Sequence, residues 1–195
     1  MTKARWASVW HQLDEVLKQN PKSVLEIGPG PGIFKNIAVN IGLNFKTLDL
    51  DPELNPDYIG SADALPLPDN SFDAVCAFQV LEHMPFDTSM KALQEMCRVA
   101  KKIAIISLPE AGYCWPNTIS LPYIRKVQFI IKNPFKKPQK HVFDGEHYWE
   151  IGKQGYDLPR VMDAIKSHAQ KNCKISTYRV HENPYHRFFI LDLCS

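Results

Sequence analysis

Short apolar runs alternate with helical patterns along most of the chain. Runs that predict strands lie at residues 24–27, 44–48, 58–60, 72–78 and 101–108. Between them, apolar residues recur at helical spacing over residues 6–17, 33–41 and 90–100. The runs 72–78 and 103–106 are almost unbroken, which is typical of strands buried on both faces. Strands that alternate with helices predict an α/β fold with a mostly parallel sheet.

The C-terminal part of the chain changes this rhythm. Residues 112–155 are rich in proline, aromatic and basic side chains, and within them only 124–132 has a helical pattern. A helix capped by Asp157 is predicted next, and it is followed by strands at 174–181 and 186–193. Because only a short turn joins these two strands, they must be antiparallel to each other.

A glycine-rich loop follows the first predicted strand. Glu26 lies near the end of that strand, and Gly28, Gly30 and Gly32 then alternate through a turn into a helix. Glycine lets a backbone approach a ligand closely, and a helix N-terminus offers unpaired N–H groups. The spacing is G-x-G-x-G, one residue shorter than the G-x-G-x-x-G of dinucleotide sites. The string resembles motif I, E/D-x-G-x-G-x-G, of the class I S-adenosylmethionine-dependent methyltransferases.

The resemblance to this family covers nearly the whole chain. It implies a Rossmann-like sheet of seven mostly parallel strands in the order 3-2-1-4-5-7-6, with the last strand antiparallel and helices on both faces. The seven strands predicted from the sequence match that number. The resemblance further implies S-adenosylmethionine as the cofactor, S-adenosylhomocysteine as its product, and methyl transfer by in-line displacement to a small-molecule or glycoconjugate acceptor.

The donor site implied by the family lies beyond the carboxyl ends of the first four strands, where open α/β sheets bind ligands. There Glu26 would stabilise the donor's amino group through water. Asp49 would accept both ribose hydroxyls, with Asp51 as the neighbouring alternative, and Asp63 would accept the adenine amine. The full set of implied donor-binding residues is Glu26, Gly28, Pro29, Gly30, Gly32, Asp49, Leu50, Ala62, Asp63, Ala64, Gln79 and Val80.

A second specific signal lies at residues 72–83. This segment resembles the FDxVxxxxxLEH stretch that marks many small-molecule members of the family. In those members the residue matching His83 lies near the acceptor, which makes His83 the first candidate for a general base and His147 the second. A base is needed only when the acceptor carries a proton that must leave. We expect no metal, because methyl transfer requires none and the cysteines show no metal-ligand spacing.

Residues 145–152 surround His147 with polar side chains interleaved with aromatic ones. Two interpretations stay open. The segment forms an acceptor pocket, or it is a lid packed for stability in which Tyr148 and Trp149 are simply buried. With either, we expect a single methyltransferase domain over residues 1–195, in which 112–155 is an insertion that forms a lid over the acceptor site.

Charge is unevenly distributed although the net charge is only +2. Residues 111–143 contain no acidic side chain, and their basic residues are Arg125, Lys126, Lys132, Lys136, Lys137 and Lys140. This segment suits an anionic or lipid-linked small-molecule acceptor. Membrane contact is the less favoured interpretation, and no nucleic-acid partner is expected, since the sequence shows no recognition module.

The cysteines and the apolar pattern bear on localisation. Five cysteines are widely scattered without a C-x-x-C pair, which argues against a disulfide framework. The first thirty residues lack a secretory pattern, and no apolar run approaches the roughly 18 residues of a membrane span. We therefore expect a cytoplasmic protein.

Two alternative functions belong to other classes. An acid after the second strand would also suit the ribose of a nicotinamide cofactor, so an NAD(P)-dependent oxidoreductase is one alternative, although its G-x-G-x-x-G spacing is absent. The other is a non-catalytic module that binds S-adenosylmethionine. A blocked acceptor pocket would distinguish that module from an enzyme.

Overall fold

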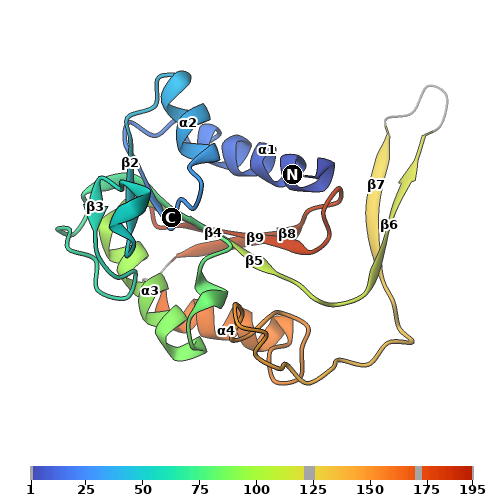
Figure 1. The fold of residues 1–195 in the computed structure, drawn as a ribbon. Helices are drawn as coiled ribbons and strands as arrows, with labels where there is room; N and C mark the ends of the chain where they lie inside the picture. Colours follow the sequence, from blue (N-terminus) through green and yellow to red (C-terminus); the bar gives the residue numbers. More distant parts are fainter. Residues whose placement is uncertain (1, 121–125, 170–172, 195) are drawn as a thin grey trace.

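The computed structural model describes residues 2–120, 126–169 and 173–194. Its central layer is a seven-stranded sheet, covered by α1 and α2 on one face and by α3 and α4 on the other (Figure 1). The helices span α1 Lys3–Leu17, α2 Ile33–Asn40, α3 Phe86–Val99 and α4 Leu158–His168. Asp157 caps α4 as predicted, because its side chain accepts a hydrogen bond from the Arg160 N–H at 3.0 Å.

The sheet has the strand order β3-β2-β1-β4-β5-β9-β8. Its strands are β1 Val24–Ile27, β2 Phe45–Asp49, β3 Tyr58–Ile59, β4 Phe72–Phe78, β5 Ala100–Pro109, β8 Lys174–Arg179 and β9 His186–Asp192. Strand β9 is antiparallel to both of its neighbours, and the other pairs are parallel. This confirms the predicted order 3-2-1-4-5-7-6, because β8 and β9 are the sixth and seventh strands of the sheet.

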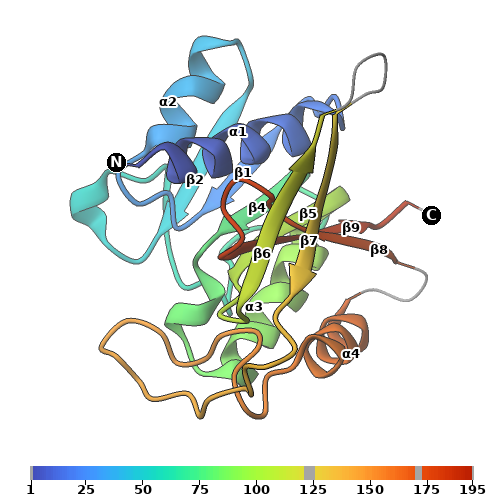
Figure 2. The same ribbon diagram turned by 90° about the vertical axis from the view of Figure 1, so that its right-hand side faces the viewer.

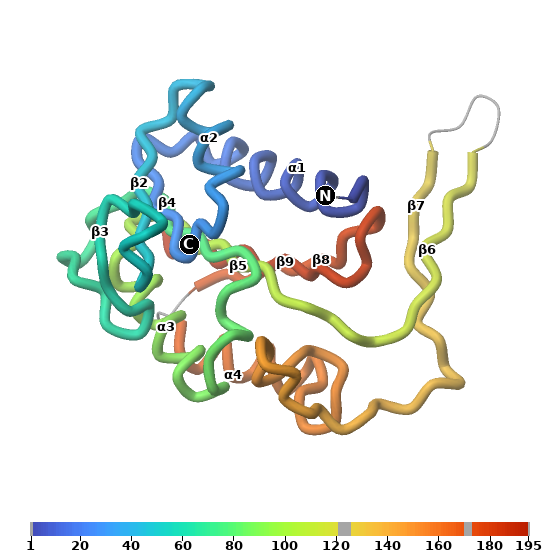
Figure 3. The backbone as a smooth tube through the Cα atoms, viewed as in Figure 1, coloured from blue at the N-terminus to red at the C-terminus, as the bar shows by residue number. Residues whose placement is uncertain are grey.

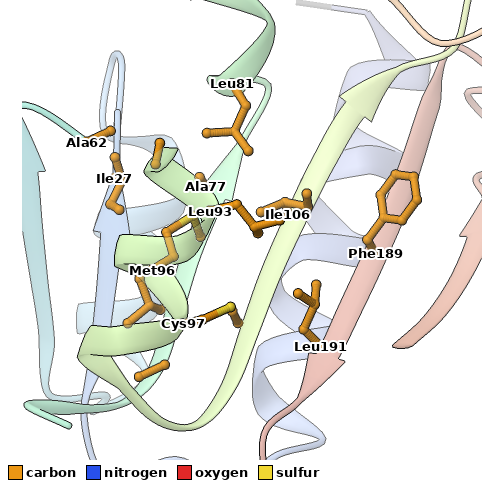
Figure 4. Packing of buried hydrophobic residues seen from close by; sticks show 14 of the residues in the cluster. Ile27, Ala62, Ala77, Leu81, Leu93, Met96, Cys97, Ile106, Phe189 and Leu191 are labelled. Atoms are coloured by element: carbon orange, nitrogen blue, oxygen red, sulfur yellow. The ribbon is translucent and has the colours of Figure 1, made fainter. Parts of the chain in front are cut away.

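The core consists of two layers, one on each side of the sheet. All seven residues of β4 are buried, as its unbroken apolar run predicts. Successive side chains alternate between the layers, so Val75 and Ala77 pack on the α3 and α4 side while Cys76 and Phe78 pack on the α1 and α2 side. Figure 4 shows the first layer, in which Leu93 and Met96 of α3 lie against β1, β4 and β5.

Strands β6 (Cys114–Ile119) and β7 (Val127–Lys132) form a separate antiparallel pair. This hairpin stands apart from the main sheet in Figure 1, and it lies in front of the sheet in the view of Figure 2. The chain enters it directly from β5 and returns by a long irregular path toward α4 (Figure 3). The hairpin and this path make up most of the predicted insertion.

One expectation about local structure was wrong. The helix expected at 124–132 is a strand from Val127 onward, because its β-branched residues pair with β6 across an exposed edge; residues 124 and 125 lie outside the described residues. The helix predicted from the pattern over residues 6–17 is present as α1, and its Trp6 and Trp10 side chains are 50% and 59% exposed.

A buried ion cluster joins the end of β5 to the last two strands. Glu110 is 2% exposed. Its carboxylate accepts a hydrogen bond from Arg187 Nε at 2.6 Å and forms an ion pair with Arg179 Nη1 at 3.3 Å. Arg179 also donates to the carbonyl oxygens of Glu110 and Gly112 at 2.9 and 2.5 Å. The point at which the insertion leaves the sheet is therefore held by charge-assisted bonds. None of the described helices combines the length and apolar character needed to cross a membrane.

Replacing Arg179 tests this cluster. Arg179→Met leaves Glu110 with a buried charge short of one partner, so we expect the free energy of unfolding to fall by about 3 kcal/mol. Urea denaturation followed by circular dichroism measures the change. Lys166→Ala is the control, because Lys166 pairs with Asp163 at 3.8 Å on an exposed surface and its loss should cost under about 0.5 kcal/mol. Equal effects of the two variants would contradict the prediction.

Candidate active site

The carboxyl ends of β1, β2 and β4 meet at one edge of the sheet. Strand β1 lies between the other two and is parallel to both. Beyond its end, the Gly28 N–H donates to the Leu48 carbonyl of β2 at 2.9 Å. In the same way the Gln79 N–H, just past β4, donates to the Ser107 carbonyl of β5 at 3.0 Å. The residues that follow β1 and β4 are thereby each held against a neighbouring strand.

The glycine loop needs glycine for two different reasons. Gly28, Gly30 and Gly32 have φ values of +64°, +51° and +70°, which strain any residue with a Cβ. At Gly28 a Cβ would also lie 2.7 Å from the Val80 Cγ2 atom, whereas at Gly30 it would meet no described atom within 4 Å. Val80 therefore forms the floor of the loop, and Gly32 caps the N-terminus of α2.

Glu26 is buried beneath this loop. Its side chain is 4% exposed, and its Oε2 atom has no hydrogen-bond partner among the described residues. Burial raises the pKa of this carboxyl to about 8, although the Lys35 ammonium acts in the opposite direction. A buried carboxyl oxygen without a partner at a glycine loop marks a place where a polar ligand group can bind.

The acids predicted to bind the donor lie at the end of β2 and after β2 and β3. Asp49 is partly exposed at the end of β2, and its Oδ1 atom accepts a hydrogen bond from the Asp51 N–H at 3.0 Å. Asp51 accepts from the Glu53 N–H and opens a short turn at Pro52–Leu54. Asp63 accepts from the Ser61 hydroxyl. Of their neighbours, Ala62 is buried in the core, while Leu50 and Ala64 are exposed.

The backbone is strained where β4 ends. Gln79 has φ +58°, a conformation that costs a non-glycine residue on the order of 1 kcal/mol. Its side-chain Nε2 donates to Ser107 Oγ at 3.2 Å, which holds the strained residue in place. The chain then makes a single tight turn at Leu81–His83. Such strain is typical of functional positions.

His83 and His147 come together although they are far apart in sequence. Their ring centroids are 5.0 Å apart. His83 Nδ1 lies 3.0 Å from the Glu146 carbonyl oxygen, and His147 Nδ1 lies 2.9 Å from Glu150 Oε1. A carbonyl or carboxylate oxygen only accepts, so each Nδ1 carries a hydrogen, and in the neutral form of each ring the lone pair is on Nε2.

Glu150 lies behind His147. It also accepts a hydrogen bond from the Tyr185 hydroxyl. Burial acts to raise the pKa of Glu150, but the hydrogen bonds from Tyr185 and His147 outweigh it and hold the pKa below its usual value. Glu150 is therefore ionised at neutral pH and orients the His147 ring.

A cavity of about 470 Å³ joins the glycine loop to the two histidines. Seven of the predicted site residues line it, namely Glu26, Gly28, Pro29, Gly30, Gln79, His83 and His147. The other predicted residues, which do not line it, are Gly32, Asp49, Leu50, Ala62, Asp63, Ala64 and Val80. The structure thus brings the first and fourth strand ends together with both histidines, while the acids after β2 and β3 lie outside the cavity.

Several lining residues escaped the sequence analysis. Helix α1 contributes Arg5, Ser8 and Gln12, and the turn before β9 contributes Asn183, Tyr185 and His186. Glu82 also lines the cavity; it is 0% exposed and neither carboxyl oxygen has a hydrogen-bond partner among the described residues. Burial, with a smaller contribution from Glu150, raises the pKa of Glu82 to about 8. Only its place beside His83 in the sequence could have singled it out.

Comparison with known proteins identifies a conserved domain type at the glycine loop. The family model of the methyltransferase domain matches residues 25–108, from β1 to nearly the end of β5. No curated protein matches the chain by sequence.

Solved structures share the fold at low sequence identity. An S-adenosylmethionine-dependent methyltransferase from Mesorhizobium loti is 15% identical, with 97% of each chain covered and a TM-score of 0.60. One from Clostridium acetobutylicum is 9% identical, covers 100% of this chain and 93% of its own, and has a TM-score of 0.62. The 1,6-didemethyltoxoflavin-N1-methyltransferase of Burkholderia thailandensis, solved with S-adenosylhomocysteine, is 13% identical over 97% and 77% of the two chains, with a TM-score of 0.61.

Two glycine variants test the loop geometry. Gly30→Ala introduces only backbone strain, and we expect a loss of about 1 kcal/mol in the free energy of unfolding. Gly28→Ala adds the clash with Val80, which should raise the loss by at least about 1 kcal/mol more. Urea denaturation of both variants gives the comparison. A Gly28→Ala variant as stable as Gly30→Ala would show that Val80 does not support the loop.

Glu26→Gln tests the buried carboxyl through pH. The folded protein keeps the Glu26 proton up to about pH 8, whereas the unfolded chain loses it near the ordinary pKa of 4.5. Stability from this group is therefore present below pH 4.5 and falls as pH rises, by about 1.4 kcal/mol per unit. Between pH 6 and 8 the wild type should lose about 2 kcal/mol more than Glu26→Gln, measured by denaturation at both values. Glu53→Gln, at an exposed position, should behave like the wild type.

Proposed function

We propose that the chain is a class I S-adenosylmethionine-dependent methyltransferase and that it transfers the donor's methyl group to a small-molecule acceptor bound beside His83 and His147. The observation that carries this proposal is the single cavity that runs from the glycine loop to both histidines. A donor at one end and an acceptor at the other would meet inside it. In-line displacement needs this alignment and the exclusion of water.

The residues of the loop fit the donor. S-adenosylmethionine supplies a methyl group on a positively charged sulfur, which becomes neutral when the methyl leaves. The unpartnered oxygen of Glu26 would accept from the donor's amino group, and Gly28 and Gly30 would let the backbone approach it. Asp49 would accept the ribose hydroxyls, and Asp63 the adenine amine. The strained Gln79 would position the methionine end.

His147 and His83 would serve the acceptor. Each presents an Nε2 lone pair, because its Nδ1–H is engaged by Glu150 or by the Glu146 carbonyl. If the acceptor is a hydroxyl or an ammonium, one of these nitrogens accepts its proton. Glu150 favours His147 for this role, since its carboxylate stabilises the imidazolium that forms. Tyr185 holds Glu150 in place.

The insertion would add contacts for an anionic acceptor. A second cavity of about 240 Å³ lies at the base of the hairpin and is lined by Lys132, Lys136, Lys137 and Lys153. We propose that residues 112–155 act as a lid whose basic side chains attract a phosphorylated or lipid-linked acceptor. The cysteines form no disulfide among the described residues, which supports the proposal of a reducing, cytoplasmic setting.

Calorimetry with S-adenosylhomocysteine tests the donor site. We expect the wild type to bind it and to bind NAD far more weakly. Asp49→Asn should lower the affinity at least about tenfold, because hydrogen bonds to a charged acceptor contribute about 1.5–3 kcal/mol. Asp163→Asn, on the exposed face of α4, is the matched control and should bind normally. Tight binding of NAD without binding of S-adenosylhomocysteine would overturn the proposal.

A further inference from the structure

Glu82 is a buried carboxyl for which the methyltransferase reaction has no use. Its side chain is 0% exposed, yet it lines the main cavity and neither oxygen has a hydrogen-bond partner among the described residues. Removing a carboxylate from water without a compensating partner costs several kcal/mol. A folded protein that keeps such a group at a site normally supplies it with a cationic partner.

The imidazoles of His83 and His147 lie close to the Glu82 carboxyl group. One ligand atom each from Glu82, His83 and His147 lies within 4.8 Å of the others. Ligands around an ion at about 2.1 Å stand roughly 3.5 Å apart, so side-chain shifts of about 1 Å would bring the three into coordination. The charges nearby also favour a cation, because the ionised Glu150 lies directly behind His147.

The hydrogen bonds of the two histidines prepare them as ligands. Metal-binding histidines donate their second ring nitrogen to a carboxylate or a carbonyl oxygen, which orients the ring and selects the tautomer. His147 contacts the Glu150 carboxylate in this way, and His83 contacts the Glu146 carbonyl. Both Nε2 atoms are left with lone pairs.

We propose that Glu82, His83 and His147 bind a divalent transition-metal ion between the donor loop and the acceptor. Two imidazole nitrogens with one carboxylate oxygen suit Zn²⁺, Fe²⁺ or Mn²⁺, and three protein ligands leave positions open for a substrate. The sequence analysis expected no metal. It could not bring these ligands together, because His147 lies more than sixty residues from Glu82 and His83 in the sequence.

The role of the ion rests on the proposed function. It implies that the methyl acceptor of the proposed reaction carries a hydroxyl group. Coordination to a divalent ion lowers the pKa of a hydroxyl. With the ion bound, the Nε2 lone pairs of His83 and His147 are used for coordination, so the proton passes to water in place of a histidine, and an oxygen lone pair forms the new bond to the methyl carbon. The carbon–sulfur bond breaks at the same time, and its electron pair stays on the donor's sulfur, which becomes neutral.

Titration of the chelator-treated protein with MnCl₂, followed by electron paramagnetic resonance, and with ZnCl₂, followed by calorimetry, tests the site without donor or acceptor. We expect one ion per chain. Glu82→Gln and His147→Asn should weaken the affinity about 100-fold or more, and Glu150→Gln about 10-fold to 100-fold, since outer ligands contribute less. His168→Asn removes an imidazole from α4, outside the cavity, and should leave the affinity unchanged.

Binding of S-adenosylhomocysteine, measured on the same preparations, separates this inference from the proposed function. It also shows that each variant is folded. If S-adenosylhomocysteine binds but neither ion does, or if Glu82→Gln and His147→Asn bind both ions as tightly as the wild type, the metal site is refuted and the donor site stands. If the ions bind and S-adenosylhomocysteine does not, the proposed function fails while the site remains.

Discussion

The parallel pairing of β1 with β4 is the constraint on which the rest of the site depends. In this register Ile27 lies beside Ala77, so the two strands end together and the chains beyond them meet. Gly28 then packs so closely on Val80 that no side chain fits between them. The same pairing places the strained Gln79 and the turn Leu81–His83 at the mouth of the cavity. The glycine loop and His83 are thus both positioned by one contact between neighbouring strands.

That arrangement also explains why two carboxyl groups are buried without full partners. Glu26 lies in β1 and Glu82 follows β4, so each enters the interior where the sheet ends. The wild-type fold tolerates this cost because tight packing on both sides of the sheet surrounds them. Buried polar groups without partners lower the stability of the fold, and such a cost is typical of ligand-binding sites. Both carboxyl groups line the cavity, where we propose that Glu26 accepts from the donor's amino group, and Glu82 lies close to the two imidazoles.

Much of the fold was predictable because each buried strand of the sheet requires a recognisable local sequence pattern. Buried parallel strands need continuous apolar runs, and the run Phe72–Phe78 corresponds residue for residue to β4. The glycine spacing likewise reflects three positive φ values. The hairpin was not predictable in this way, since Val127–Lys132 is exposed on both faces and its strand conformation depends on pairing with β6. Glu82 and Tyr185 were missed because their roles come from contacts across the chain.

In the segment around His147, core packing and cavity lining divide between adjacent residues, since Trp149 is buried while His147 lines the cavity. Trp149 is completely buried, and its indole N–H donates to Ser89 Oγ at 2.9 Å. The Tyr148 N–H donates to the Glu82 carbonyl at 2.8 Å, although its ring is 45% exposed. These contacts anchor the backbone on α3 and on the turn after β4. His147 is therefore held against His83 by a rigid core contact, so the geometry of the histidine pair does not depend on the exposed hairpin.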